Sequence, residues 1–156
     1  MIVWNRKWRR KMGSKALNYL GIMRKAGACA VGETDCGATC RAGKAKVLLV
    51  ASDASDNARS RARGFVYGRG IPLVVLPFAK FELAGLLGRG MTAMIAVTDL
   101  GLAEAFMRTL AAEDPQEEYV QTAAQLAERL EAEKQRKKER QAHQQNRRFG
   151  KRRKQT

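Results

Sequence analysis

Histidine, proline, cysteine and aromatic residues are scarce in this sequence of 156 residues. It contains one His, three Pro and three Cys, and aromatic residues make up 6% of it. Three cysteines cannot form an even disulfide framework. Cys36 and Cys40 are one helical turn apart, but a zinc site needs two further ligands and the single His143 is far away in the sequence. Small buried hydrophobic residues are the better interpretation of these cysteines, and we expect neither a metal nor a cofactor.

Long apolar runs are also absent. No segment is apolar over the length needed to span a bilayer, and no apolar stretch of signal-peptide length follows the basic first residues. We therefore expect a cytoplasmic protein without a membrane partner.

The residue patterns of common enzymes are missing as well. Gly85, Gly88 and Gly90 are not followed by the Gly-Lys-Ser/Thr of a phosphate loop. Ser, His and Asp residues occur in no arrangement that indicates an activated nucleophile, and no paired carboxylates lie in an apolar setting. The sequence predicts a protein that is not an enzyme.

Positive charge is abundant and unevenly placed. The formal net charge is +15. Residues 1–15 carry six Lys or Arg and no acid, and residues 134–156 carry eleven against Glu139 alone. Residues 99–133, in contrast, hold nine acids and two basic residues. Basic ends on a mildly basic domain indicate a polyanionic partner, and RNA, DNA and an anionic membrane all satisfy this criterion.

Short apolar runs alternate with amphipathic segments between residues 14 and 111. The runs KVLLVA, IPLVVL and AMIAVT read as buried strands, and Ala28–Val31 as a short extended piece. We expect helices to begin after the caps Ser14, Ser55 or Asp56, and Asp99. The first should stop at Gly27, and others should cover 34–42, 78–87 and 100–110. The segment ARSRARGFVYGRG (58–70) should begin as a helix. The pattern predicts an α/β fold, a three-layer α/β/α sandwich with a small mixed sheet.

The two ends of the chain have a different composition from this domain. Residues 1–13 read as a basic disordered leader. Asp114, Pro115 and Glu117 signal the start of another helix, whose weak apolar stripe ends near Leu130. We expect this helix to fray into a disordered basic tail over the rest of residues 114–156.

Two polar turns come to the same end of one helix-strand unit. The first, Gly32–Asp35, opens a helix, and the second, Ser52–Asp56, follows the central strand. Helix starts present unpaired backbone N–H groups and the positive end of the dipole, which favour phosphate. The alternative interpretation is ordinary helix capping, by Thr34 and Asp35 in the first turn and by Ser55 or Asp56 in the second.

The order of several segments resembles the kink-turn RNA-binding ribosomal-protein superfamily, and within it the small bacterial YlxQ-type members. These segments are LGIMRKAG (20–27), VGETDCGATCRAGKAKVLLVASDASDN (31–57), GIPLVVLP (70–77), LAGLLGRG (83–90) and MIAVTDLGLAEAF (94–106). The resemblance covers roughly residues 15–110. It implies an α/β/α sandwich that binds kinked RNA and has no enzymatic activity. We expect the protein to be a monomer.

The resemblance also implies which residues contact RNA. In the family's first turn, Gly32 and Glu33 are followed by Thr34, where Asn or an acid is usual, by Asp35 in place of glutamate, and by Ala38 in place of a lysine. Glycine admits the RNA backbone, and an acid accepts from a guanine edge.

Two further segments match the family's RNA-facing turns. The resemblance places Asp53, Ala54 and Ser55 beside the RNA. It implies that the loop after Gly88 packs apolar residues against the extruded nucleotide, here through Gly90, Met91, Thr92 and Ala93. A plain helix-to-strand connection is the competing interpretation of this loop.

Basic residues of the central region are expected to form an electrostatic rim around these turns, although charged residues on helices usually serve only to solvate them. The members of this rim are Arg41, Lys44, Lys46, Arg59, Arg61 and Arg63.

The leading hypothesis is a non-enzymatic protein that recognises kink-turn-like structured RNA, ribosomal or ribosome-associated. The alternative is a protein-interaction module of the translation or transcription machinery, whose basic tails contact RNA non-specifically. The missing lysine at Ala38 favours the alternative.

Overall fold

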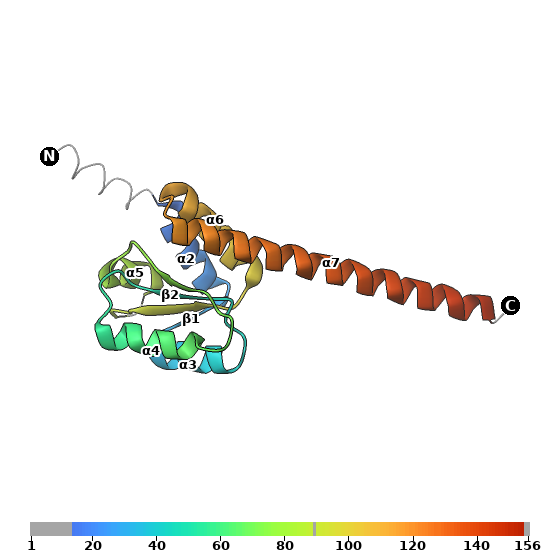
Figure 1. Ribbon diagram of the computed structural model, residues 1–156, viewed down its shortest axis with the longest axis horizontal. Coiled ribbons are helices and arrows are strands. Elements are labelled where there is room, and N and C mark those ends of the chain that lie inside the picture. Colours follow the sequence, from blue (N-terminus) through green and yellow to red (C-terminus); the bar gives the residue numbers. More distant parts are fainter. Residues whose placement is uncertain (1–13, 89, 155–156) are drawn as a thin grey trace.

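The computed structural model describes residues 14–88 and 90–154, and the expected leader at 1–13 lies outside them (Figure 1). Four strands form one mixed sheet in the order β1-β4-β2-β3. Strand β4 pairs antiparallel with both β1 and β2, whereas β2 and β3 run parallel. The strands are β1 (Cys29–Val31), β2 (Val47–Val50), β3 (Leu73–Val75) and β4 (Met94–Val97).

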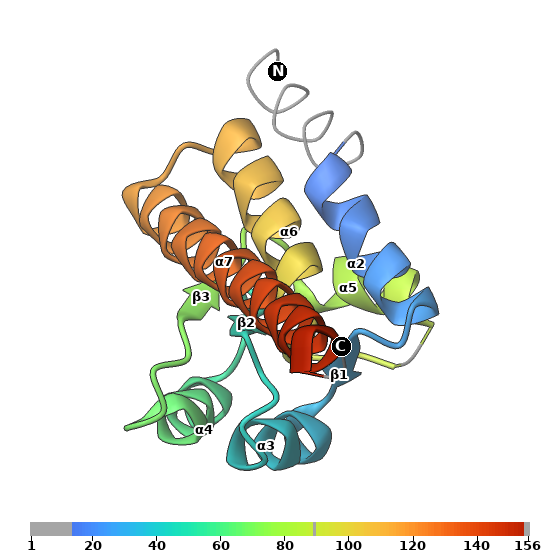
Figure 2. The ribbon, with the colours of Figure 1, turned by 90° about the vertical axis from the view of Figure 1, so that its right-hand side faces the viewer.

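Helices cover both faces of this sheet (Figure 2). One face carries α3 (Glu33–Arg41) and α4 (Asp56–Val66). The other carries α2 (Lys15–Lys25), α5 (Lys80–Leu87), α6 (Leu100–Glu113) and the first part of α7 (Glu117–Lys154). The three-layer α/β/α sandwich with a small mixed sheet is therefore confirmed.

The alternation of side chains along β2 explains the two layers of core. Val47 and Leu49 face the core beneath α2, α5, α6 and α7, and Leu48 and Val50 face the core beneath α3 and α4. All four are buried. A strand covered on both faces reads as an unbroken apolar run, because neither of its alternating sides meets water.

The expected helix caps are also confirmed. The side chains of Ser14, Ser55 and Asp99 accept hydrogen bonds from the N–H groups of Leu17, Ala58 and Leu102 at 3.1, 3.1 and 2.9 Å. These bonds satisfy donors that have no partner within the helix.

The C-terminal helix differs from the expectation. Helix α7 begins at Glu117, and Asp114 instead ends α6, since its N–H donates to Leu110 O at 2.8 Å. The expected loss of helix after Glu131 was wrong, because α7 continues to Lys154 and projects beyond the sandwich (Figure 1). Residues 131–149 contain no Gly or Pro and are rich in Glu, Lys, Arg, Gln and Ala, which are strong helix formers.

None of the described helices has both the length and the apolarity to cross a membrane.

Tyr119 fixes the start of α7 on the sandwich. Its side chain is 2% exposed, and its hydroxyl donates to Val75 O of β3 at 2.6 Å. Burial raises the pKa of this phenol to about 12, because the ionised form would lose its hydration. Leu126, two turns later, is also buried in the same core.

We expect Tyr119→Phe to lower the free energy of unfolding by about 1 kcal/mol, because it leaves the Val75 carbonyl without this donor. Tyr119→Ala, which also removes the packed ring, should cost about 3 kcal/mol or more. Urea denaturation measures both. Equal stability of Tyr119→Phe and wild type would show that the hydrogen bond does not hold α7 in place.

Candidate nucleic-acid interface

Strand β4 brings the three expected RNA-facing turns to one edge of the sheet. Because β4 lies between β1 and β2, the residues before it are flanked by the ends of both neighbours. The Gly32 N–H donates to Met94 O at 3.0 Å on one side, and the Ala51 N–H donates to Ala93 O at 2.8 Å on the other. We call residues 32–35, 52–55 and 90–93 together the turn edge.

Gly32 opens this edge with a backbone conformation that other residues avoid. Its φ of 94° and ψ of 158° lie in a region occupied essentially by glycine alone. A Cβ built there would meet nothing within 4 Å, so the space in front of the turn is open. Gly32 supplies no side-chain cap, and the helix begins its hydrogen-bond ladder with Cys36 N–H to Gly32 O at 2.9 Å. The amides of the first turn therefore have no acceptor one turn earlier in their own helix.

The other residues of the first turn divide between surface and scaffold. Thr34 and Asp35 are exposed. Glu33 instead forms an ion pair with Arg61 of α4, which ties the two helices of this layer together.

The second turn is held by its own side chains. The Asp53 carboxylate accepts from the Lys80 N–H at 2.9 Å, and Ser55 caps α4. The Arg59 guanidinium donates to Ser52 O at 2.8 Å. Ala54 is buried. Asp53 and Ser55 thus shape the turn, so the capping interpretation of Ser55 is confirmed.

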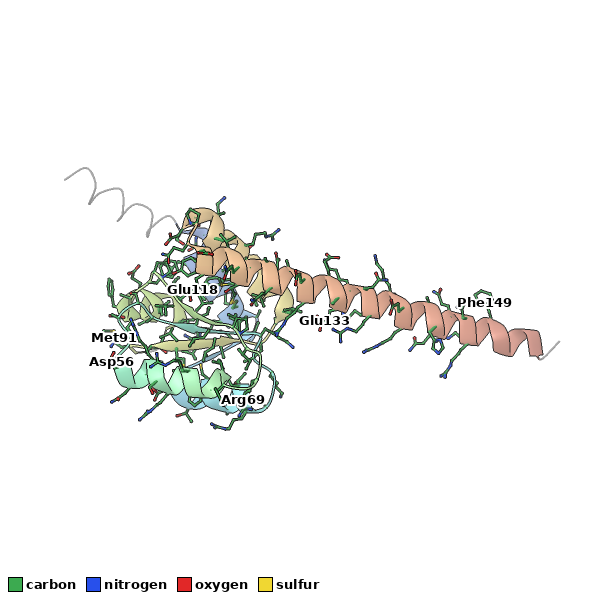
Figure 3. The ribbon with its side chains drawn as sticks, in the orientation of Figure 1. Asp56, Arg69, Met91, Glu118, Glu133 and Phe149 are labelled. Carbon is green, nitrogen blue, oxygen red and sulfur yellow. The ribbon has the colours of Figure 1, made fainter. Side chains whose placement is uncertain are left out.

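The third turn exposes one large apolar side chain. Met91 is 67% exposed, whereas its neighbour Thr92 is buried and donates through Oγ1 to Met94 O at 3.3 Å. Gly90 is exposed and Ala93 is half-buried. Figure 3 shows Met91 and Asp56 at the same end of the sandwich, with Arg69 at the other end.

The structure does not bring Arg41 to this edge. Arg41 is the last residue of α3, eight residues after Glu33, which is about 12 Å along a helix. It lies at the opposite end of the sheet, where it lines a hollow with Lys46 and Arg69. The expected electrostatic rim is therefore divided between two ends of the molecule, because helix α3 and strand β2 separate residues that are close in sequence.

Phe81 is a further candidate beside the turn edge that is not among the residues predicted from the sequence. It lies in the first turn of α5, next to Lys80, whose N–H binds Asp53, and its side chain is 66% exposed. The helix begins at Lys80 and buries Leu83 and Leu87. Leu83 and Leu87, four residues apart, lie on the buried face of α5, and Phe81 does not share that face. The sequence spacing of these residues could therefore have predicted that the Phe81 ring is exposed.

The cysteines are part of the core, as the sequence predicts. Cys36 and Cys40 of α3 are buried in the core between the sheet and helices α3 and α4, and the Cys36 Sγ donates to Ala30 O of β1 at 3.4 Å. Burial raises the pKa of the Cys36 thiol to about 12 and also raises that of Cys40, because a thiolate would be poorly solvated there. Among the residues that the structure describes, no group of three or more His, Cys, Asp or Glu is placed to hold a metal ion.

Comparison with known proteins identifies the fold alone. No family model matches the chain, and no curated protein matches it. Among solved structures, the chain is similar to a protein of unknown function from Bacillus halodurans C, with 21% sequence identity and a TM-score of 0.58. The similarity covers 62% of this chain and 97% of that one.

We expect Gly32→Ala to lower the free energy of unfolding by about 1–2 kcal/mol, because alanine is strained at this φ and ψ. Gly85→Ala is the matched control. It also has no atom within 4 Å of the added Cβ but lies within α5 at a negative φ, so it should be neutral or stabilising. Urea denaturation of both variants tests the assignment, and equal effects would contradict it.

A second expectation concerns Cys36. Its pKa is raised from 9.0 to about 12 in the folded state, so the unfolded chain loses this proton first as the pH rises. The stabilisation is complete below pH 9 and is lost between pH 9 and 12. The free energy of unfolding of Cys36→Ala should therefore fall less over this range than that of wild type. Parallel pH curves for the two proteins would contradict the burial of the thiol.

Proposed function

We propose that the protein binds RNA at the turn edge and recognises kink-turn-like structured RNA, ribosomal or ribosome-associated, as a non-enzymatic cytoplasmic monomer. The observation that supports this most is the meeting of three turns around the start of β4. These turns are the segments that resemble the RNA-facing turns of the kink-turn-binding superfamily, and a single RNA surface can contact all three only if they are adjacent.

The chemistry of the turn edge suits a bent RNA strand. Gly32 leaves open space for a phosphate to approach the first-turn amides of α3, where the helix dipole favours negative charge. The Thr34 hydroxyl and the Asp35 carboxylate are both on exposed residues and can form hydrogen bonds with base edges. Met91 offers an apolar surface for an unstacked base, and such bases are the usual target of specific RNA recognition.

The charge of the chain supports the same class of partner. A net charge of +15 attracts a polyanion through counterion release, which adds affinity without specificity. Shape recognition at the turn edge would then supply the specificity.

A protein-interaction module remains the second candidate, and one observation favours it. The turn edge itself is rich in acids, since Asp35, Asp53 and Asp56 lie at or beside it. Ala38, in place of the family's lysine, is exposed on α3 and adds no positive charge. Capture of translation or transcription proteins that persists after ribonuclease treatment would support this candidate.

Thr34→Glu tests the RNA-binding proposal without threatening the fold. An acid in the first turn of a helix is favourable for the helix dipole, so α3 should stay folded. The same acid repels a phosphate at that position, and we expect binding to a kink-turn RNA to weaken about tenfold at 0.1 M salt.

Gln121→Glu is the matched control, because it adds the same charge at an exposed position on α7. Fluorescence anisotropy with a kink-turn RNA and with a straight duplex of the same composition gives the readout. Wild type should prefer the kink-turn, Gln121→Glu should keep that preference, and Thr34→Glu should lose it. Equal binding of both RNAs by wild type would contradict the proposal.

A further inference from the structure

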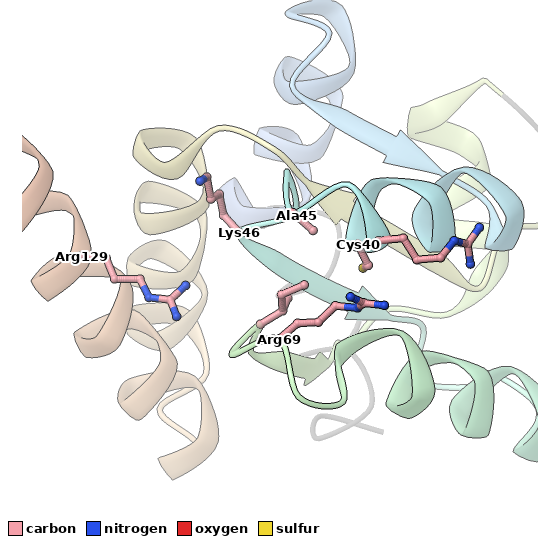
Figure 4. Close-up of a pocket in the computed structure, with 8 residues that line it drawn as sticks. Cys40, Ala45, Lys46, Arg69 and Arg129 are labelled. Carbon is pink, nitrogen blue, oxygen red and sulfur yellow. The ribbon is translucent and has the colours of Figure 1, made fainter.

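The end of the sheet opposite the turn edge carries a basic hollow (Figure 4). It has a volume of about 190 Å³, and Ala45 and Ile71 contribute apolar atoms to its wall. Its cations come from four different parts of the chain, namely Arg41 at the end of α3, Lys46 before β2, Arg69 after α4, and Arg129 of α7. None of the described residues that line it is acidic.

Two of these cations are held in place by the chain itself. The Arg69 Nε donates to Phe65 O at 3.0 Å, and the Arg129 Nη2 donates to Gly70 O at 2.7 Å. A guanidinium has five N–H donors, so each retains donors for a ligand after making this bond. Fixing the side chains in advance lowers the entropy cost of binding an anion.

Helix capping accounts for only part of this cluster. Arg41 ends α3 and Arg69 follows α4, and cations at helix C-termini are stabilised by the dipole. Lys46 and Arg129 do not occupy helix ends. All four side chains line the same hollow, and none of the described lining residues is an acid that would offset their positive charge.

The positive surface continues from the hollow along α7. Helix α7 packs on the sandwich through Tyr119 and Leu126. Residues that follow at intervals of three and four positions, beginning with Arg129, lie on the same side of the helix. Beyond the sandwich this face is exposed and is interrupted by Glu133 (Figure 3). Its basic residues are Arg136, Lys137, Arg140, Arg147 and Arg148.

We propose that the hollow binds a phosphate of an RNA backbone and that the basic face of α7 contacts further phosphates of the same strand, without reading sequence. From Arg129 to Arg148 the track is about 28 Å long, which is more than a single small anion can occupy. A polyanion with regularly spaced charges fits this length. The inference rests on RNA being the partner, as proposed above, but it concerns a surface distinct from the turn edge.

The double variant Lys46→Gln/Arg129→Gln tests this site. Loss of two phosphate contacts should lower the slope of log affinity against log salt by about 1 to 2 between 0.05 and 0.2 M salt. Affinity for kink-turn RNA and for straight duplex should fall by the same factor, about tenfold at 0.1 M salt.

Lys15→Gln/Arg108→Gln is the matched control, since it removes the same charge from exposed positions on α2 and α6. It should leave the slope close to that of wild type. Circular dichroism during thermal unfolding should give similar midpoints for both double variants, which separates lost binding from lost folding.

The outcomes separate this inference from the proposed function. An unchanged slope in Lys46→Gln/Arg129→Gln, with kink-turn preference intact, would overturn the inference and leave the turn edge as the binding site. A lowered slope in this variant, together with full binding by Thr34→Glu, would support the hollow and overturn the turn edge. If inorganic phosphate at constant ionic strength protects wild type from thermal unfolding, but not the double variant, and the RNA slope is unchanged, the hollow takes a free anion and the inference is wrong.

Discussion

Strand β4 lies between β1 and β2, and its backbone pairing with both neighbours determines where the turns of the domain meet. A strand that pairs antiparallel with neighbours on both sides must begin where both of them end. Its first backbone groups then accept hydrogen bonds from Gly32 on one side and Ala51 on the other. Three turns that are up to about 60 residues apart in sequence thereby form one continuous surface. The strand order thus places the three turns next to one another.

Charge and shape are separated between the two ends of this small domain. The turn edge offers an open glycine, first-turn amides and an exposed methionine, and it carries several acids. The opposite end gathers Arg41, Lys46, Arg69 and Arg129 without an acid among the described lining residues. Such a division suits an RNA-binding protein in which one surface recognises a bend and another adds salt-sensitive attraction to the backbone.

The sequence predicts the features that depend on neighbouring residues. Caps such as Ser14 and Asp99, and the buried strand Val47–Val50, follow from local hydrogen bonding and from apolar runs. The sequence could not place Arg129, because the packing of α7 through Tyr119 brings that side chain into the same hollow as Arg69. Arg41 was expected near the turn edge because it is close in sequence to Gly32. Helix α3 lies between these two residues and carries Arg41 to the opposite end of the sheet. Helix α7 is longer than expected because its predicted end was taken from the end of the apolar stripe. That stripe marks only the part that packs on the sandwich, and the residues after Glu131 favour a helix through their intrinsic propensity.

Binding at the turn edge can be observed residue by residue through the backbone amide chemical shifts of the isotopically labelled protein during titration with a kink-turn RNA. We expect the largest changes to fall together on the amides of residues 32–35, 52–55 and 90–93, because these turns meet around the start of β4. Changes restricted to other parts of the chain, with all three turns unaffected at saturation, would contradict it.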